Sequence, residues 1–249
     1  MNKRTVLLLI GGALLISGCA PKGCREDRSS GLALADLPAP TWGEATVTGT
    51  VRFEGEAPVM KPIEAAKHCA DITEEWAVVG EAGELANVLV FLEDAPRSTG
   101  AEREAVLLDQ VDCRFVPHVV GVQVGQPMIA RNSDMELHNV HYTPSRNANT
   151  NFSLEKATEE RAVEFSYPEA DPVRIRCDVH PWMEAYVGVF AHPFFAVTDA
   201  AGRFTIERVP AGQYTLKAWH ERFGTRTEQI TVADAGEVVA GFIFARRGS

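Results

Sequence analysis

The chain has 249 residues, of which 45% are hydrophobic and 23% are charged, the ordinary balance of a globular protein. It is acidic, because 34 Asp and Glu outnumber 24 Lys and Arg and give a formal net charge of −10. An acidic chain without a Lys/Arg tract is poorly suited to nucleic acid or to anionic lipid headgroups. With 20 Gly and 5 Cys it is neither collagen-like nor a small disulfide scaffold, so we expect one large or two small domains.

The first 18 residues have the layout of an export signal. A short basic head precedes an apolar run over residues 5–16, which is too short to span a bilayer as a helix. Residues 15–19 (LISGC) resemble a bacterial lipobox, which implies that Cys19 is lipidated and becomes the mature N-terminus. Ala20 after this cysteine implies the outer membrane, so we expect a lipid-anchored cell-envelope protein that faces the periplasm. The alternative is an ordinary secretory signal that happens to contain a cysteine.

The segment after the signal, residues 19–44, mixes Gly, Ser, Pro and charged residues without periodicity. This composition predicts a flexible tether that holds the folded body away from the membrane. Cys24 lies inside it, as a spare thiol or as a second linkage of the tether. The expected order is therefore a signal peptide over 1–18, a tether over 19–44, a first domain over 45–192 and a second domain over 193–249.

From residue 45 onward the pattern predicts an all-β chain. Residues 47–53 alternate between apolar and polar, and further short apolar or alternating runs are separated by Gly and Pro. Strands of this length predict a β-sandwich or barrel, while helical periodicity is weak and no repeat of 20–50 residues indicates a solenoid or propeller. The further runs cover residues 87–92, 119–124, 128–130, 162–167, 173–177 and 186–190.

The last part of the chain has its own signature. Residues 209–216 (VPAGQYTL) resemble the carboxypeptidase regulatory-like, or transthyretin-like, β-sandwich, while the family's Asp-Gly-x-Phe turn is altered in residues 199–204 (DAAGRF). The resemblance covers roughly residues 195–245. It implies a small accessory β-sandwich over 193–249, without peptidase chemistry.

The residues best suited to chemistry lie in and before one short loop. Cys177, His180 and Met183 follow one another at three-residue intervals. Apolar residues alternate with Arg in the strand before the loop, so Cys177 faces inward with the apolar set. A tight loop held by Pro181 can bring the imidazole and the thioether to the same point. Two histidines, one cysteine and a weak axial methionine are the ligands of blue-copper electron-transfer centres.

Such a site needs one more histidine from a distant strand. His138 and His141 are both candidates, and they point to opposite faces if their segment is a strand. His138 lies 39 residues before Cys177 and shares its face with Val140 and Tyr142.

The whole pattern resembles the cupredoxins. An extended strand leads into residues 138–140 (HNV), and the Cys-x-x-His-x-x-Met loop has a Pro after its His, as in amicyanin. The resemblance implies a cupredoxin-like Greek-key β-sandwich over 45–192, with Asn139 tying the two ligand loops together and His141 at the rim. It assigns one type 1 copper ion to His138, Cys177, His180 and Met183.

This resemblance implies a one-electron carrier with an unidentified redox partner protein. It places His180 near an exposed apolar patch through which electrons leave, here lined by Pro181 and Trp182. No Gly-rich phosphate loop and no Gly-x-Ser-x-Gly elbow occurs, so we expect no enzyme activity. The alternative is a non-redox cell-envelope module that binds a protein or polysaccharide through aromatic residues such as Trp182 and Tyr186.

The remaining cysteines have a structural use. Cys69 and Cys113 are the pair left over if Cys19 is lipidated, Cys177 holds the metal and Cys24 stays in the tether. A disulfide between them would persist in an oxidising compartment and pin the long segment 54–114 to the sandwich. Four cysteines that are not lipidated allow three full pairings, and a pairing of Cys177 with Cys113 would remove the copper site.

Overall fold

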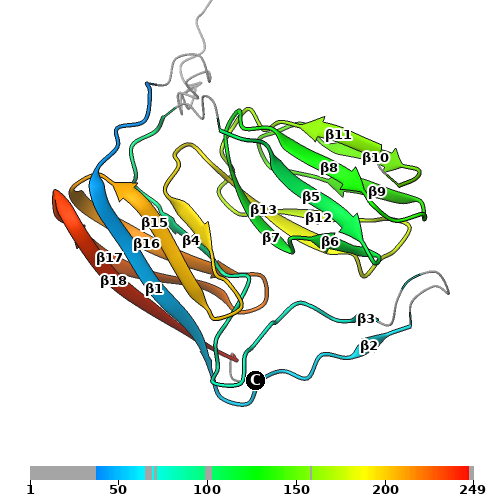
Figure 1. The fold of residues 1–249 in the computed structure, drawn as a ribbon, viewed down its shortest axis with the longest axis horizontal. Coiled ribbons are helices and arrows are strands. Elements are labelled where there is room, and N and C mark those ends of the chain that lie inside the picture. Colours follow the sequence, from blue (N-terminus) through cyan, green and yellow to red (C-terminus); the bar gives the residue numbers. More distant parts are fainter. Residues whose placement is uncertain (1–37, 65–68, 70–71, 99–102, 158, 247–249) are drawn as a thin grey trace, which may run out of the picture. The chain divides into compact units, whose positions relative to one another are not determined.

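The structure is a computed structural model that describes residues 38–64, 69, 72–98, 103–157 and 159–246 (Figure 1). Every regular element in these ranges is a β-strand, which confirms the predicted all-β class. The predicted signal peptide, Cys19, Cys24 and the tether up to residue 37 lie outside the described residues. No described segment forms a helix that is long and apolar enough to cross a membrane.

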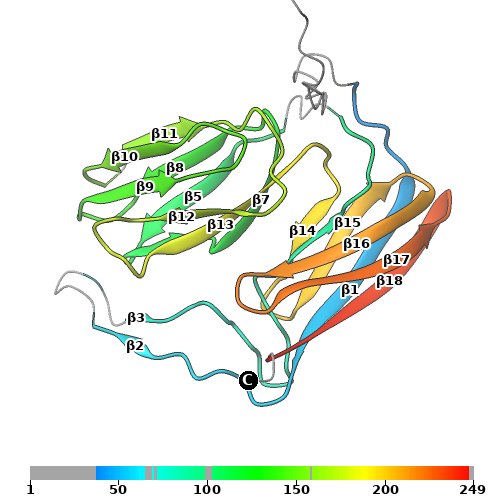
Figure 2. The same cartoon turned by 180° about the vertical axis from the view of Figure 1, so that it is seen from behind.

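One β-sandwich, here called the C-terminal sandwich, has two sheets whose facing apolar residues form one core. Its strand β1 lies between an antiparallel and a parallel neighbour and pairs with the parallel one along its whole length (Figure 2). The first sheet has the order β15 (Arg203–Val209), β1 (Glu44–Glu54) and β18 (Ala235–Ala245); the second has β14 (Phe195–Val197), β4 (Leu89–Leu92), β16 (Gly212–His220) and β17 (Gly224–Val232).

These pairings correct the predicted domain boundary. Strands β1 and β4 were expected in the first domain, but they lie in the C-terminal sandwich, each between two strands from the end of the chain. The alternation in β1 buries Val47, Val51 and Phe53 as predicted. Alternation shows that one face of a strand is buried and does not show which sheet the strand joins. The strands from β5 to β13 therefore form another sandwich, which is inserted in the chain between β4 and β14.

The end of the predicted tether is also part of the C-terminal sandwich. The Trp42 ring lies 5.8 Å from the Phe194 ring, and the Arg208 guanidinium lies 4.2 Å from the Trp42 ring centre. The Gly43 N–H donates a hydrogen bond to the Arg208 carbonyl oxygen at 2.9 Å. The aromatic contact and the backbone hydrogen bond fix residues 42–43 on this sandwich. The prediction of a flexible tether up to residue 44 is therefore wrong for these residues.

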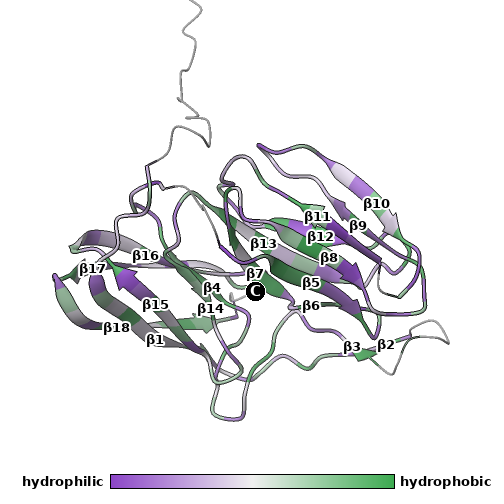
Figure 3. Ribbon diagram, turned by 45° about the horizontal axis from the view of Figure 1, so that its top comes forward, coloured by the Kyte–Doolittle hydropathy of each residue, from purple (hydrophilic) through white to green (hydrophobic). Residues whose placement is uncertain are grey.

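The inserted sandwich, here called the middle sandwich, is contiguous in the chain. Its strands cross repeatedly from one sheet to the other, and β5–β8 and β7–β13 are parallel pairs. Strands β7 and β13 carry mainly apolar residues (Figure 3). The sheets have the orders β10 (Thr150–Leu154), β9 (His138–Tyr142), β12 (Val173–Arg176), β13 (Glu184–Phe190), β7 (Val119–Gln123), and β11 (Glu159–Val163), β8 (Met128–Asn132), β5 (Val106–Val111), β6 (Arg114–Val116).

A disulfide joins the middle sandwich to the segment between β1 and β4. Cys69 lies between the short paired strands β2 (Pro62–Ile63) and β3 (Ile72–Thr73), and Cys113 lies in the turn between β5 and β6. Their sulfur atoms are bonded, with the Cα atoms 5.6 Å apart, so the predicted pairing is present. Cys177 is the free cysteine among the described residues.

Candidate metal centre

Three predicted ligands meet at one end of the middle sandwich. His138 begins β9, Cys177 directly follows β12, and His180 lies in the loop that leads to β13. Strands β9 and β12 are antiparallel neighbours, so the residues after β12 lie beside the start of β9. A pairing between strands more than thirty residues apart in the chain therefore brings the two ligand segments together.

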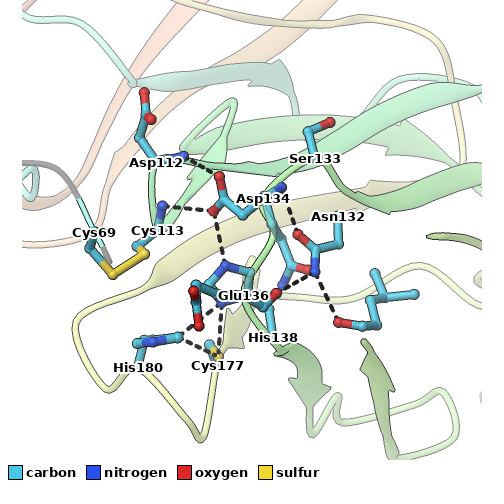
Figure 4. A network of polar contacts seen from close by, with 12 residues as sticks. Cys69, Asp112, Cys113, Asn132, Ser133, Asp134, Glu136, His138, Cys177 and His180 are labelled. Carbon is cyan, nitrogen blue, oxygen red and sulfur yellow. Dashed lines mark hydrogen bonds and ion pairs between the residues drawn. A yellow bond between two sulfur atoms is a disulfide. The ribbon is translucent and has the colours of Figure 1, made fainter. Parts of the chain in front are cut away.

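The ligand atoms converge within hydrogen-bonding distances (Figure 4). The two imidazole Nδ1 atoms of His138 and His180 are 2.9 Å apart. The Cys177 Sγ atom lies 4.0 Å from His138 Nδ1 and 3.8 Å from His180 Nδ1. All three residues are buried, with exposed fractions of 0%, 1% and 7% for His138, Cys177 and His180. We call these three residues the ligand cluster.

These separations fit a single bound ion. A first-row ion such as zinc lies about 2.0 Å from an imidazole nitrogen and about 2.3 Å from a thiolate sulfur. Two nitrogens on one ion are then at most about 4.0 Å apart, and a nitrogen and a sulfur at most about 4.3 Å apart. The three distances in the ligand cluster lie within these limits, so one ion can contact all three atoms.

The backbone of Met183, the fourth predicted ligand, closes the loop from Cys177 to Met183. The Met183 N–H donates to the His180 carbonyl oxygen at 2.9 Å, and the Cys177 N–H donates to the Met183 carbonyl oxygen at 3.1 Å. The Met183 side chain is buried in the same apolar core as Cys177. Pro181 lies exposed in the turn between them. The backbone thus holds Met183 beside the ligand cluster.

The Asn139 side chain connects the two ligand segments, as the cupredoxin resemblance implied. Its Oδ1 accepts the Asp178 N–H at 2.6 Å. Its Nδ2 donates to the Asn151 Oδ1 at 2.7 Å and to the Asp178 Oδ2 at 3.1 Å. Asn139 is itself buried and its partners Asn151 and Asp178 are exposed, so these bonds fix the start of the ligand loop on β9 at the edge of the core.

The alternative histidine lies outside the ligand cluster. The His141 Nδ1 atom lies 2.8 Å from the Asp178 Oδ2 and 3.1 Å from the Arg176 Nη2. Its side chain is partly exposed. The structure therefore places His138, and not His141, beside Cys177 and His180.

Asp134 is a residue of the site that the sequence interpretation did not assign. Its Oδ2 lies 2.9 Å from the His138 Nε2. Since a carboxylate only accepts hydrogen bonds, Nε2 carries the ring hydrogen and Nδ1 presents its lone pair to the ligand cluster. Asp134 stands four residues before His138 in the loop after β8, but this spacing alone does not show which way its carboxylate points.

His180 is kept neutral by its surroundings. Burial lowers the pKa of its imidazole, and the nearby His138 lowers this pKa further, while Glu136 and Asp134 act in the opposite direction. The Trp182 ring covers it, with ring centres 5.2 Å apart. A neutral imidazole is the form that binds a metal ion.

The match to a known family lies in the C-terminal part of the chain. Residues 182–243 match the family model of the carboxypeptidase regulatory-like domain. This match confirms the resemblance stated for residues 195–245. The carboxypeptidase regulatory-like match begins inside the ligand loop, although the C-terminal sandwich also uses β1 and β4 from much earlier in the chain.

No curated protein matches the chain, whereas several solved copper proteins align with part of it. A mutant of amicyanin, in its reduced Cu(I) form at pH 4, is 19% identical, with a TM-score of 0.31 over 41% of this chain and 98% of that one. A purple cupredoxin from Nitrosopumilus maritimus is 17% identical, with a TM-score of 0.29 over 35% and 100%.

A copper-containing nitrite reductase (NirK) from Thermus scotoductus SA-01 is 20% identical, with a TM-score of 0.30 over 37% of this chain. The chain spans only 24% of the length of that reductase. Alignments with such low TM-scores do not support a shared function. The metal centre is inferred instead from the distances between the atoms of the ligand cluster.

Proposed function

We propose that this chain is a type 1 copper protein that carries one electron at a time. The observation that carries the proposal is the convergence of two imidazole Nδ1 atoms and one free cysteine sulfur at a buried point. Thiolate and imidazole ligands with a nearby methionine favour copper over the hard ions that oxygen ligands select. Copper bound there supplies a one-electron couple between Cu(II) and Cu(I).

The protein's own groups prepare the site. Cys177 must lose its thiol proton, because the thiolate is the form that binds metal. The His138 Nδ1 already presents a lone pair, so the His180 Nδ1 donates the hydrogen bond between the two rings. Binding therefore requires His180 to carry its ring hydrogen on Nε2 instead. Asn139 and the strand pairing of β9 with β12 keep the ligand segments in place during this exchange.

We further propose that the protein works in the cell envelope, anchored through a lipid on Cys19 and facing the periplasm. The Cys69–Cys113 disulfide supports an oxidising compartment. A redox protein is the proposed partner, and exposed apolar side chains on the loops beside the two histidines support a docking surface near the site: Met135, Leu137 and Val179.

The test is a visible absorption and electron spin resonance spectrum of the Cu(II)-loaded protein, made without its first 19 residues. We expect an intense thiolate-to-copper band that is absent in Cys177→Ala and unchanged in Cys24→Ala, the matched control. A colourless Cu(II)-treated protein would contradict the proposal and leave a tethered β-sandwich binding module as the function.

A further inference from the structure

The turn between β5 and β6 lies against both histidines of the ligand cluster. The sulfur atoms of Cys69 and Cys113 both lie within 4.8 Å of a ring nitrogen of His180. The Cys113 sulfur also lies within 4.8 Å of a ring nitrogen of His138. The disulfide is therefore a close neighbour of the candidate metal centre as well as a link to the β2–β3 segment (Figure 4).

A first connection runs from this turn to His138 through Asp134. The Asp134 Oδ1 accepts the Asp112 N–H at 2.8 Å, and the Oδ2 accepts the Cys113 N–H at 2.9 Å. The same Oδ2 atom lies 2.9 Å from the His138 Nε2. One carboxylate oxygen thus holds both the disulfide-bonded residue and a ligand imidazole.

A second connection runs to His180 through Trp182. The Trp182 indole N–H donates to the Cys113 carbonyl oxygen at 3.2 Å. The indole ring packs against the His180 imidazole at an angle of 54°, with ring centres 5.2 Å apart. The N–H and the carbonyl of one residue, Cys113, are therefore each connected to a different histidine.

The β5–β6 hairpin and several side-chain contacts hold this turn. Asp112 and Cys113 have φ values of 51° and 56°, in the left-handed region that residues other than glycine seldom adopt. Besides the pairing of Val111 with Arg114, the disulfide, Asp134 and Trp182 restrain Cys113. If removal of the disulfide shifts this turn, the two connections link that shift directly to the imidazoles.

We propose that Asp134 and Trp182 are positioning residues that couple the Cys69–Cys113 disulfide to the metal centre. Reduction of the disulfide then loosens His138 and His180 and weakens metal binding. The assignment of these histidines as ligands rests on the proposed function. The reductant is a dithiol, which becomes a disulfide while the S–S bond of the protein takes up two electrons and two protons and yields two thiols. Cys69 is only partly buried, so the exchange can begin at its sulfur.

The first test uses the metal-free protein, so its result does not depend on copper. The ring ¹⁵N resonances of the histidines are recorded before and after reduction with a dithiol. We expect the His138 and His180 resonances to shift, whereas those of His192 and His220, buried among phenylalanines of the C-terminal sandwich, stay in place. Unchanged His138 and His180 resonances in the reduced protein would overturn the proposal.

The second test measures the affinity for Cu(I) in variants. Cys69→Ser combined with Cys113→Ser opens the disulfide without adding thiols, and we expect a loss of about tenfold or more, as for other outer partners of metal ligands. Asp134→Asn combined with Trp182→Phe should lower the affinity similarly. Adding the two serine substitutions to this double variant should then change the Cu(I) affinity little further, because the connections through Asp134 and Trp182 are already broken. Fully additive losses would contradict the coupling.

Matched control variants distinguish the loss of contacts that position the ligand histidines from a general loss of stability. Asp199→Asn alters a turn aspartate whose Oδ1 accepts two backbone N–H groups in the C-terminal sandwich, and Trp76→Phe removes another indole N–H bond. We expect neither control to change the Cu(I) affinity. If the double serine variant does not fold, Asp134→Asn and Trp182→Phe in the disulfide-bonded protein must still change the charge-transfer spectrum of the copper-loaded protein, and an unchanged spectrum would overturn the proposal.

Discussion

The two sandwiches bury their histidines in different ways. In the middle sandwich the rings of His138 and His180 face each other. His180 also lies beside the Cys177 sulfur, and His138 lies beside the Asp134 carboxylate. His192 in the connection from β13 to β14 and His220 in β16 of the C-terminal sandwich each stack on a phenylalanine ring, with ring centres 6.0 and 4.4 Å apart. Burial lowers the pKa of both of these histidines to about 4. Burial alone therefore keeps an imidazole neutral, and only convergence with other ligand atoms makes it a candidate metal ligand.

The polar groups around the histidines differ as well. At the ligand end of the middle sandwich, the buried Gln110 Nε2 donates to the Asn139 carbonyl, and the Asn132 Nδ2 donates to the Leu154 carbonyl. The core of the C-terminal sandwich is mainly apolar, and besides the buried His220 it has Thr198 as a buried polar link between Val88 and Leu85. Buried polar groups are costly unless they are satisfied. The interior of the middle sandwich holds hydrogen-bonded polar side chains both beside the ligand cluster and away from it, where the Gln123 Nε2 donates to the Ser98 carbonyl oxygen.

The largest expected effect concerns the folding of the two regions. A fragment of residues 193–249 lacks β1 and β4, which lie inside the two sheets of the C-terminal sandwich. We expect the circular dichroism spectrum of this fragment to be that of an unfolded chain. A chain that joins residues 38–98 to 192–249 by a short linker restores both strands and should fold. A folded 193–249 fragment would contradict the corrected domain boundary.

The next effect separates the two kinds of buried histidine. We expect His138→Gln and His180→Gln to weaken copper binding at least about 100-fold, beyond the range for outer partners of a ligand. His192→Gln and His220→Gln should leave it unchanged. Isothermal titration with Cu(II), checked by the visible spectrum, measures this difference. Equal losses from both pairs would show that burial, rather than convergence, explains the result.

The C-terminal sandwich should in turn govern acid stability. The folded-state pKa of His192 and His220 is about 4, below the ordinary value of 6.5, so the native state binds fewer protons between these pH values. Stability is complete above about pH 6.5 and is lost as the pH falls toward 4, by about 3 kcal/mol for each histidine. Urea unfolding at pH 7 and 4.5 measures the loss. His192→Gln and His220→Gln should flatten this dependence, and a wild-type protein equally stable at both pH values would contradict it.

The smallest effect compares one buried polar link in each sandwich. Thr198→Val leaves two buried backbone groups without their side-chain partner, and Asn139→Ala removes the hydrogen bonds that join β9 to the start of the ligand loop. We expect each variant to lower the free energy of unfolding by about 1–3 kcal/mol. Only Asn139→Ala should also speed copper release, because Asn139 fixes the ligand loop. Urea unfolding and a chelator-driven release assay distinguish the two outcomes. Equal copper release from both variants would remove the special role of Asn139.

Much of the site could be predicted because its key features are local. The three-residue spacing of Cys177, His180 and Met183 lies within one loop, and the structure closes that loop through two backbone hydrogen bonds. Strand alternation predicts that His138 and His141, three residues apart, point to opposite faces, and the cupredoxin resemblance selected His138 between them. The Cys69–Cys113 pairing was one of several possibilities, and the proximity of the two Cα atoms selects it.

Other features were decided by contacts between distant parts of the chain. Asp134 acquires its role because its loop meets both the β5–β6 turn and His138, a coincidence that no spacing encodes. In the same way, β1 joins β18, nearly two hundred residues later in the chain. Alternation, turn residues and ligand spacing act over a few residues and can be read in order along the chain. Strand partners and second contacts to a ligand depend on which surfaces meet after folding, and only the tertiary structure specifies them.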